Sequence, residues 1–197
     1  MSVLDFNNAG EQRASGGLIP KDTTAFVVLS VRPGGQGEGG WLKANKDGSC
    51  LMLDLEFTVD GGPYDRRKFW TYLVVEGETD GQKEAANISR SKLRAILESA
   101  RGVSPTDTSD AAIAARRASS YADFDVLRFP TKIDVEKGKA KNDGSGERYD
   151  DKNALGVVLT PGDEDYLSPG PQRAPQAAPK ANPASSAPKA NKPAWAA

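Results

Sequence analysis

Residues 50–59 and 64–75 alternate apolar with polar or charged side chains, and only the turn Asp60-Gly61-Gly62-Pro63 separates them. A period of two is the pattern of a strand with one buried face. A short Gly/Pro turn between two such runs predicts an antiparallel β-hairpin. The expected buried side chains are Leu51, Leu53, Leu55, Phe57 and Val59 in the first strand and Phe69, Thr71, Leu73 and Val75 in the second.

The register of this hairpin decides where Trp70 lies. If Leu55 faces Phe69, the apolar sides match and Trp70 lies on the outer face with the acidic residues of the first strand. A slip of one residue pairs Leu53 with Trp70 and buries the indole, because side chains alternate between faces. Burial of the apolar residues favours the first register.

Other segments complete a mainly β pattern with inserted helices, an α+β class. Strands are expected over 25–32, over 124–136 around Pro130, and over 153–159, with a short strand or loop base at 41–46. Helices are expected over 87–101, with an apolar stripe, and more weakly over 109–120. Five strands with late helical material are typical of a small closed or partly open barrel of the OB type.

Composition divides the chain into three parts. Residues 1–24 are expected to form an N-terminal arm over the domain, and residues 25–167 an OB-like domain. Residues 168–197 are rich in Pro and Ala and contain no acid, so a disordered basic tail is expected there. Trp195, near the end of this tail, could dock on a partner protein or be there by chance.

The bulk composition excludes several functional classes. The chain has no histidine and a single cysteine, Cys50, so Ser-His and Cys-His pairs and a structural zinc cluster are excluded. The lone cysteine indicates a reducing compartment. No apolar run approaches the length of a membrane span and no signal peptide is recognisable, which favours the cytoplasm. The net charge of −1 means that a site for polyanions must be a local patch.

The second strand of the hairpin combines cations and aromatics on its outer side, which suits binding of a single-stranded nucleic acid. Cations would contact phosphates, and rings would stack on unpaired bases. A charged loop at residues 138–152 could act as a clamp, although a solvated hairpin tip explains it equally well. The candidate binding residues are Trp41, Lys43, Arg66, Lys68, Trp70, Tyr72, Lys139, Lys141, Arg148 and Tyr149.

Ordinary structural roles compete with each of these assignments. Asp54 and Glu56 share the expected outer face and could neutralise Arg66 and Lys68 as surface ion pairs. The basic side of the 87–101 helix is most simply a solvated face, and contact of Arg90 or Arg94 with phosphate has no further support. The Gly-rich loop at 33–40 lacks the Gly-Lys-Ser/Thr of a phosphate-binding loop.

Several segments resemble a phage-encoded family that was long catalogued as a domain of unknown function. They are L-I-P-K-D-T-T, R-R-K-F-W-T-Y, I-S-R-S-K-L-R-A-I-L-E-S-A-R-G and K-I-D-V-E-K-G, followed by Y-D-D-K-N-A-L-G-V-V-L with its Lys152-Asn153 pair. The resemblance spans roughly residues 15–167. Members are similar to single-stranded-DNA-binding proteins of phage replication and recombination modules. It implies an OB-like fold and protection of DNA. Recombination or replication proteins could bind through the tail and Trp195, and further copies of the chain are another candidate partner, since single-strand binders often assemble.

Non-enzymatic binding of single-stranded DNA with little sequence preference is therefore the leading hypothesis, and no cofactor is expected. A protein-interaction or accessory domain, with the tail and Trp195 as its working part, is the alternative. A metal-dependent nuclease using Asp54, Glu56 and Lys68 is a remote third, because no third acidic ligand stands out.

Overall fold

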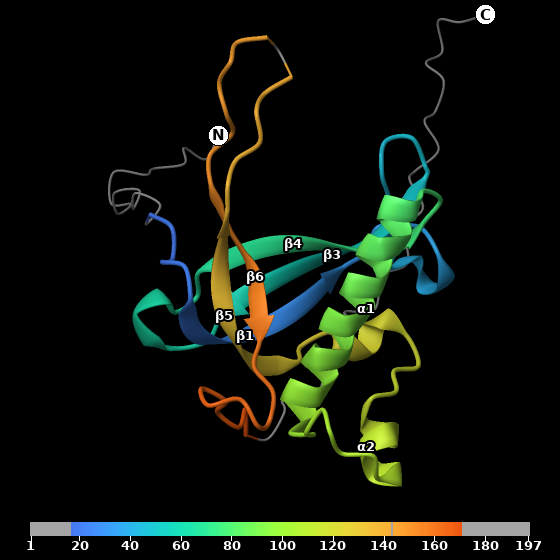
Figure 1. The fold of residues 1–197 in the computed structure, drawn as a ribbon, viewed down its shortest axis with the longest axis vertical. Coiled ribbons are helices and arrows are strands. Elements are labelled where there is room, and N and C mark those ends of the chain that lie inside the picture. Colours follow the sequence, from blue (N-terminus) through green and yellow to red (C-terminus); the bar gives the residue numbers. More distant parts are fainter. Residues whose placement is uncertain (1–16, 143, 171–197) are drawn as a thin grey trace, which may run out of the picture.

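The computed structural model of the chain describes residues 17–142 and 144–170 (Figure 1). Most of the expected N-terminal arm, and the tail from residue 171 onward with Trp195, lie outside the described residues. The described part is a mainly antiparallel β-sheet with one long helix packed against it, which confirms the β-rich α+β class.

Six strands and two α-helices make up this part. The strands are β1 (Thr23–Arg32), β2 (Leu42–Ala44), β3 (Cys50–Val59), β4 (Lys68–Gly77), β5 (Arg128–Glu136) and β6 (Lys152–Val158). The helices are α1 (Asp80–Arg101) and α2 (Asp110–Ala115). The short β2 settles the choice that the sequence left open at residues 41–46 in favour of a strand.

The sheet is ordered β4, β3, β1, β5, β6, and every pairing is antiparallel. The short β2 also pairs with β3, beyond the end of its pairing with β1. β6 comes back towards β4, where the Leu155 amide donates to the Thr71 hydroxyl at 3.1 Å. Among the described residues no strand ladder joins β4 to β6, so the sheet is not closed and a barrel is not confirmed.

The hairpin of β3 and β4 has the face assignment expected from the sequence. Phe57 faces Phe69 and Glu56 faces Trp70, so the apolar sides coincide and the indole lies outside. The predicted partner of Phe69, Leu55, faces Thr71 instead. This shift of two residues leaves the faces unchanged, because side chains alternate with a period of two.

The connection between β3 and β4 is longer than the four-residue turn expected. A 3₁₀ turn covers Gly62–Tyr64, and β4 begins only at Lys68. Arg66 has a φ of 63°, in the left-handed region, so the backbone cannot run as a strand through it. The predicted strand at 64–75 therefore starts four residues too early, and Arg66 belongs to the turn.

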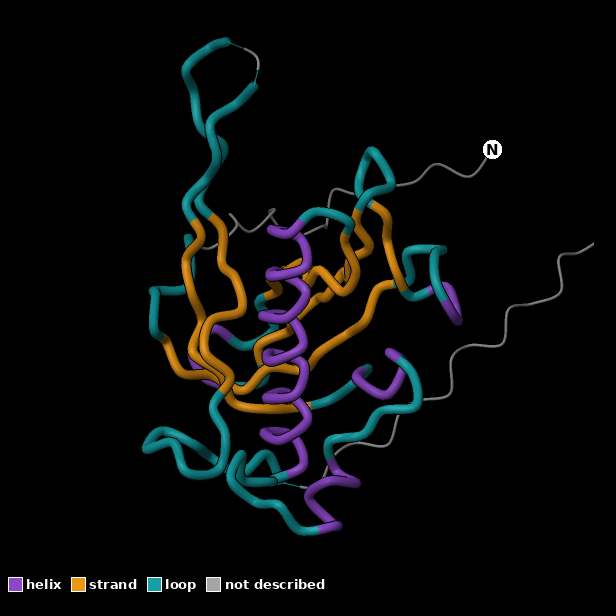
Figure 2. The backbone as a smooth tube through the Cα atoms, turned by 45° about the vertical axis from the view of Figure 1, so that its right-hand side comes forward, coloured by secondary structure: helices purple, strands orange, loops and turns teal. Residues whose placement is uncertain are grey.

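α1 stands against the strands and closes one side of the core (Figure 2). Its apolar stripe contributes Leu93, Ile96, Leu97 and Ala100 to the core, as expected. The helix begins at Asp80, seven residues before the predicted start, because Thr79 and Gln82 form a capping box ahead of two polar turns. α2 ends at Ala115, five residues before the predicted end. No helix in residues 17–142 or 144–170 is long and apolar enough to cross a membrane.

The domain extends beyond both of its predicted boundaries. Ile19, assigned to the arm, is buried in the core, and its backbone amide and carbonyl bond the side-chain amide of Asn153 at 2.9 and 2.8 Å. At the other end, Tyr166 donates to the Ser99 carbonyl, and Arg128 donates to the carbonyl of the buried Pro169. Residues 17–24 and 168–170 are thus part of the folded unit.

Replacing Asn153 by Ala should lower the free energy of unfolding by about 2 kcal/mol, because the Ile19 backbone groups would be left buried without partners. Urea denaturation followed by circular dichroism measures this loss. Asn87→Ala, an exposed site on α1, serves as the control and should change stability little. An Asn153→Ala protein as stable as the wild type would contradict the assigned role.

Candidate nucleic-acid interface

The registers of neighbouring strands arrange the outward side chains in rows across the sheet. The rows are Lys68, Thr58, Val28 and Arg128; then Trp70, Glu56 and Ser30; then Tyr72, Asp54 and Arg32. Side chains that face each other on adjacent strands are close enough to interact directly. The acids therefore form a column on β3, with the aromatics of β4 on one side and β1 on the other. We call this surface the outer face.

The two aromatics of β4 are available to a ligand. Trp70 is 43% exposed and Tyr72 is 47% exposed, although Phe69 and Leu73 beside them are buried. Their exposure follows from the register of the hairpin rather than from any property of the rings. Two adjacent flat side chains on one strand give a surface on which unpaired bases can stack.

Glu56 neutralises the first cation of β4. Its Oε1 lies 2.5 Å from Lys68 Nζ, and its Oε2 accepts a hydrogen bond from Trp70 Nε1 at 3.0 Å. The hydrogen bond from Lys68, with a smaller contribution from that of Trp70, holds the pKa of the Glu56 carboxyl below its usual value. The carboxylate is therefore ionised at neutral pH.

Asp54 forms ion pairs with two further cations at the other end of the outer face. This buried carboxylate lies 3.7 Å from Arg32 Nη1 and 3.6 Å from Lys43 Nζ. Lys43 also donates to the Tyr72 hydroxyl at 3.3 Å and lies 5.1 Å from the centre of its ring. The Tyr72 hydrogen bond is the main cause that raises the pKa of Lys43. The Lys43 ammonium is thereby held beside the aromatic that it would flank in a complex.

Arg32 and Arg128 belong to the outer face but were not among the residues selected from the sequence. Arg32 points outward at the end of β1, as the alternation along that strand indicates. The sequence could have revealed this position, but Arg32 directly precedes the Gly-rich loop and was assigned no role. Arg128 lies over the ring of Phe26, 3.8 Å from its centroid, and its Nε bonds Asp60 at 2.5 Å. Only the pairing of β1 with β5 brings Arg128 to this face.

A groove of about 690 Å³ joins the outer face to the β5–β6 hairpin. Lys68, Trp70 and Tyr72 line one side, and Asp150 and Lys152 at the base of the hairpin line another. Two segments selected independently from the sequence thus meet at one concave surface.

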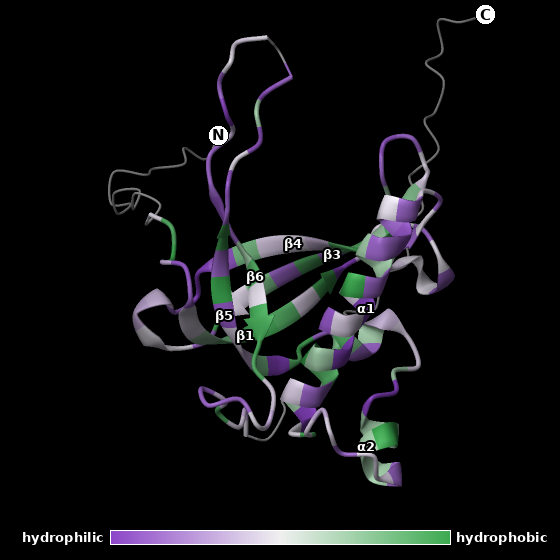
Figure 3. Cartoon of the chain, viewed as in Figure 1, coloured by the Kyte–Doolittle hydropathy of each residue, from purple (hydrophilic) through white to green (hydrophobic). Residues whose placement is uncertain are grey.

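The hairpin itself extends well away from the sheet (Figure 1) and is predominantly hydrophilic (Figure 3). Gly138 lies at its base, where a Cβ would come within 1.6 Å of the Tyr149 carbonyl oxygen, so no other residue fits. Tyr149 is 62% exposed. The hairpin therefore carries an accessible ring on an extended arm.

Ion pairs divide the cations of the hairpin into two groups. Lys141 pairs with Glu147, and Lys137 pairs with Asp151. Lys139 and Arg148 form no ion pair with another described residue. Of the cations selected from the sequence in this loop, these two are therefore the better placed to meet phosphates.

Trp41 and Arg66, two of the candidate binding residues selected from the sequence, lie away from the groove. Trp41 is half-buried and packs against the core, because it closes the Gly-rich loop at the start of β2. The Arg66 side chain is 92% exposed in the turn before β4, 3.6 Å from Asp65. Neither residue lines the groove.

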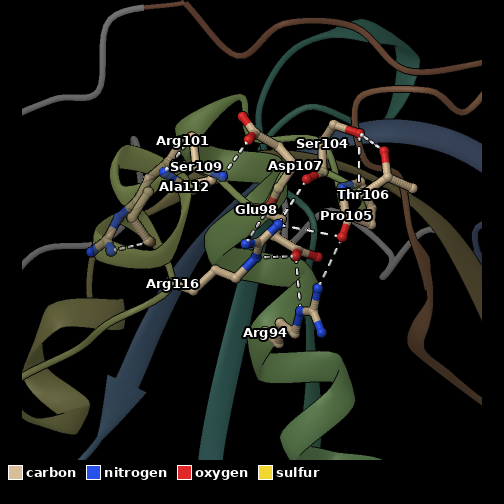
Figure 4. A network of polar contacts seen from close by, with 11 residues as sticks. Arg94, Glu98, Arg101, Ser104, Pro105, Thr106, Asp107, Ser109, Ala112 and Arg116 are labelled. Atoms are coloured by element: carbon tan, nitrogen blue, oxygen red, sulfur yellow. Dashed lines mark hydrogen bonds and ion pairs between the residues drawn. The ribbon is translucent and has the colours of Figure 1, made fainter.

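Arg94 of α1 and Arg116, which follows the last residue of α2, stabilise the fold (Figure 4). The buried Glu98 carboxylate accepts hydrogen bonds from Arg94 Nε at 2.8 Å and from Arg116 Nε at 2.6 Å. Arg116 also donates to the carbonyls of Ser104 and Asp107, and its side chain is only 16% exposed. The interpretation of the basic side of the 87–101 helix as a solvated face is therefore incomplete, because Arg94 and Arg116 bind the loop between α1 and α2.

Glu98→Ala should destabilise the protein by about 3 kcal/mol, because it removes the buried partner of two guanidinium groups. Chemical denaturation measures the effect. Glu84→Ala, at an exposed position of the same helix, is the matched control and should stay within about 0.5 kcal/mol of the wild type. Equal stability of the two variants would show that the network contributes little.

No group of three or more acidic or cysteine side chains within residues 17–142 and 144–170 is arranged to hold a metal ion. Asp54 and Glu56, considered above as metal ligands, are each engaged with cationic side chains. Comparisons of the chain with protein-family models, with curated proteins and with solved structures find no match.

Proposed function

We propose that this protein binds single-stranded DNA with little sequence preference, through the outer face and the groove beside it. The observation that carries the proposal is the exposure of Trp70 and Tyr72 side by side in a groove whose other side is the charged hairpin. Bases would stack on the two rings, and the phosphates would meet the cations around them.

Stacking supplies the sequence tolerance of this mode of binding. Each base stacked on an aromatic side chain contributes about 1–3 kcal/mol, whichever base it is. Lys139 and Arg148, on the hairpin, would follow the backbone of the strand and make the affinity depend on salt.

We further propose that the sheet is an OB-like barrel whose last gap, between β4 and β6, is narrow. The strand order and the bond from Leu155 to Thr71 support this, as does the position of α1 after the third long strand. The resemblance to phage single-strand binders adds the setting: replication or recombination of phage DNA in the cytoplasm of the host bacterium.

Trp70→Ala and Tyr72→Ala should each weaken binding of a labelled oligothymidylate by at least about fivefold, the lower end of the stacking contribution. Fluorescence anisotropy at low salt measures the dissociation constants. Ile113→Ala, which truncates an exposed apolar side chain on α2, is the control and should bind as the wild type does. Failure of the wild type to bind any single-stranded oligonucleotide would refute the proposal.

The contribution of Lys139 and Arg148 should be measurable in the salt dependence of DNA binding. Replacing Lys139 and Arg148 together by Ala should reduce the slope of log K against log salt by about 1.4, since each contact with a single-strand phosphate contributes about 0.7. Lys137 and Lys141, replaced together, form the matched control, because their charges are paired within the hairpin. Identical slopes for the two double variants would remove the hairpin from the interface.

A further inference from the structure

Glu56 holds two hydrogen-bond donors that project from β4. Lys68 Nζ lies at 2.5 Å from Oε1, and Trp70 Nε1 lies at 3.0 Å from Oε2, so each carboxylate oxygen binds one donor. Lys68 and Trp70 are two positions apart on one strand and therefore point the same way. Together they form a two-donor site for an anion with two accessible oxygens.

A phosphodiester group matches this site as well as a carboxylate does. It carries one negative charge shared by two non-bridging oxygens, and charge-assisted hydrogen bonds to such oxygens are among the stronger ones in proteins. Resting on the function proposed above, we propose that Lys68 and Trp70 form a phosphodiester subsite that Glu56 occupies in the free protein. A backbone phosphate of the bound strand then displaces the Glu56 carboxylate.

The surroundings of Glu56 keep the free-energy cost of displacing its carboxylate small. In this ion pair the Lys68 side chain is 50% exposed and the Glu56 side chain 19%, so water reaches the ammonium group and the pair contributes only about 1 kcal/mol. Ser30 of β1 lies in the same row on the other side of Glu56. Its hydroxyl can donate a hydrogen bond to the displaced carboxylate. Arg32 is near enough that its charge also contributes to the lowered pKa of Glu56.

Asp54, the other acid of the column, is placed differently. Its side chain is only 7% exposed and lies between Arg32 and Lys43, so it is a fixed part of the surface. The exchange with phosphate is therefore specific to Glu56. Glu56 acts as an internal competitor: it weakens binding by repelling the phosphate and by occupying the donors that the phosphate needs.

Glu56→Gln tests this subsite, because it removes the charge and keeps the shape and an acceptor oxygen. Binding of a labelled oligothymidylate should tighten by about fivefold, the effect of removing one unit charge about 4 Å from a phosphate in a hydrated site. The slope of log K against log salt should become steeper by about 0.7. In the wild type the displaced carboxylate takes up a salt cation, which offsets the counterion released from DNA at Lys68, whereas glutamine takes up none. Fluorescence anisotropy over a salt series gives both values.

Two further variants make the test specific. In the Glu56→Gln background, Lys68→Met should abolish both the gain in affinity and the steeper slope, since the gain depends on the freed ammonium group. Glu84→Gln makes the same change of charge on α1, away from the outer face, and should leave both values near those of the wild type.

Unchanged or weaker binding by a folded Glu56→Gln protein would overturn the subsite, because Glu56 would then only position Lys68 and Trp70. In that case the binding of DNA by the wild type would still support the function proposed above. A wild-type protein that binds no single-stranded DNA would overturn both proposals.

Discussion

The stacked rings of Phe57 and Phe69, with centroids 5.1 Å apart, fix the register on which the rest of the surface depends. They face each other across β3 and β4 and pack into the core together with Phe129. Because faces alternate along a strand, burial of these rings forces Trp70 and Tyr72 outward. A slip of one residue would bury the indole and leave no stacking surface.

The same register brings acids into the middle of the surface. Glu56 and Asp54 separate the aromatics of β4 from β1 and compensate most of the charge of Lys68, Lys43 and Arg32. A surface built this way does not attract polyanions by a strong field, which agrees with the net charge of −1 for the whole chain. Its affinity for DNA would rest first on stacking, with the cations released from their partners as phosphates arrive.

The cations of the described residues have two different roles. Arg94 and Arg116 hold the loop between α1 and α2 through Glu98, although in the sequence they resemble any exposed basic residue. Lys139 and Arg148 lie on an extended hairpin and form no ion pair with described residues. A count of basic residues in the sequence therefore overestimates the positive charge available to a ligand, because acidic partners distant in the chain neutralise part of it.

The sequence by itself determined the strands, the core-facing residues and the outward position of Trp70, because an alternation with a period of two has only one favourable orientation. Other features depended on contacts distant in sequence. Asn153 ties down Ile19 across 134 positions, Arg128 reaches the outer face through the pairing of β5 with β1, and Glu56 binds two donors of β4. Local patterns carry no record of such partners, so only the tertiary structure decided which charges remain available and where the groove lies.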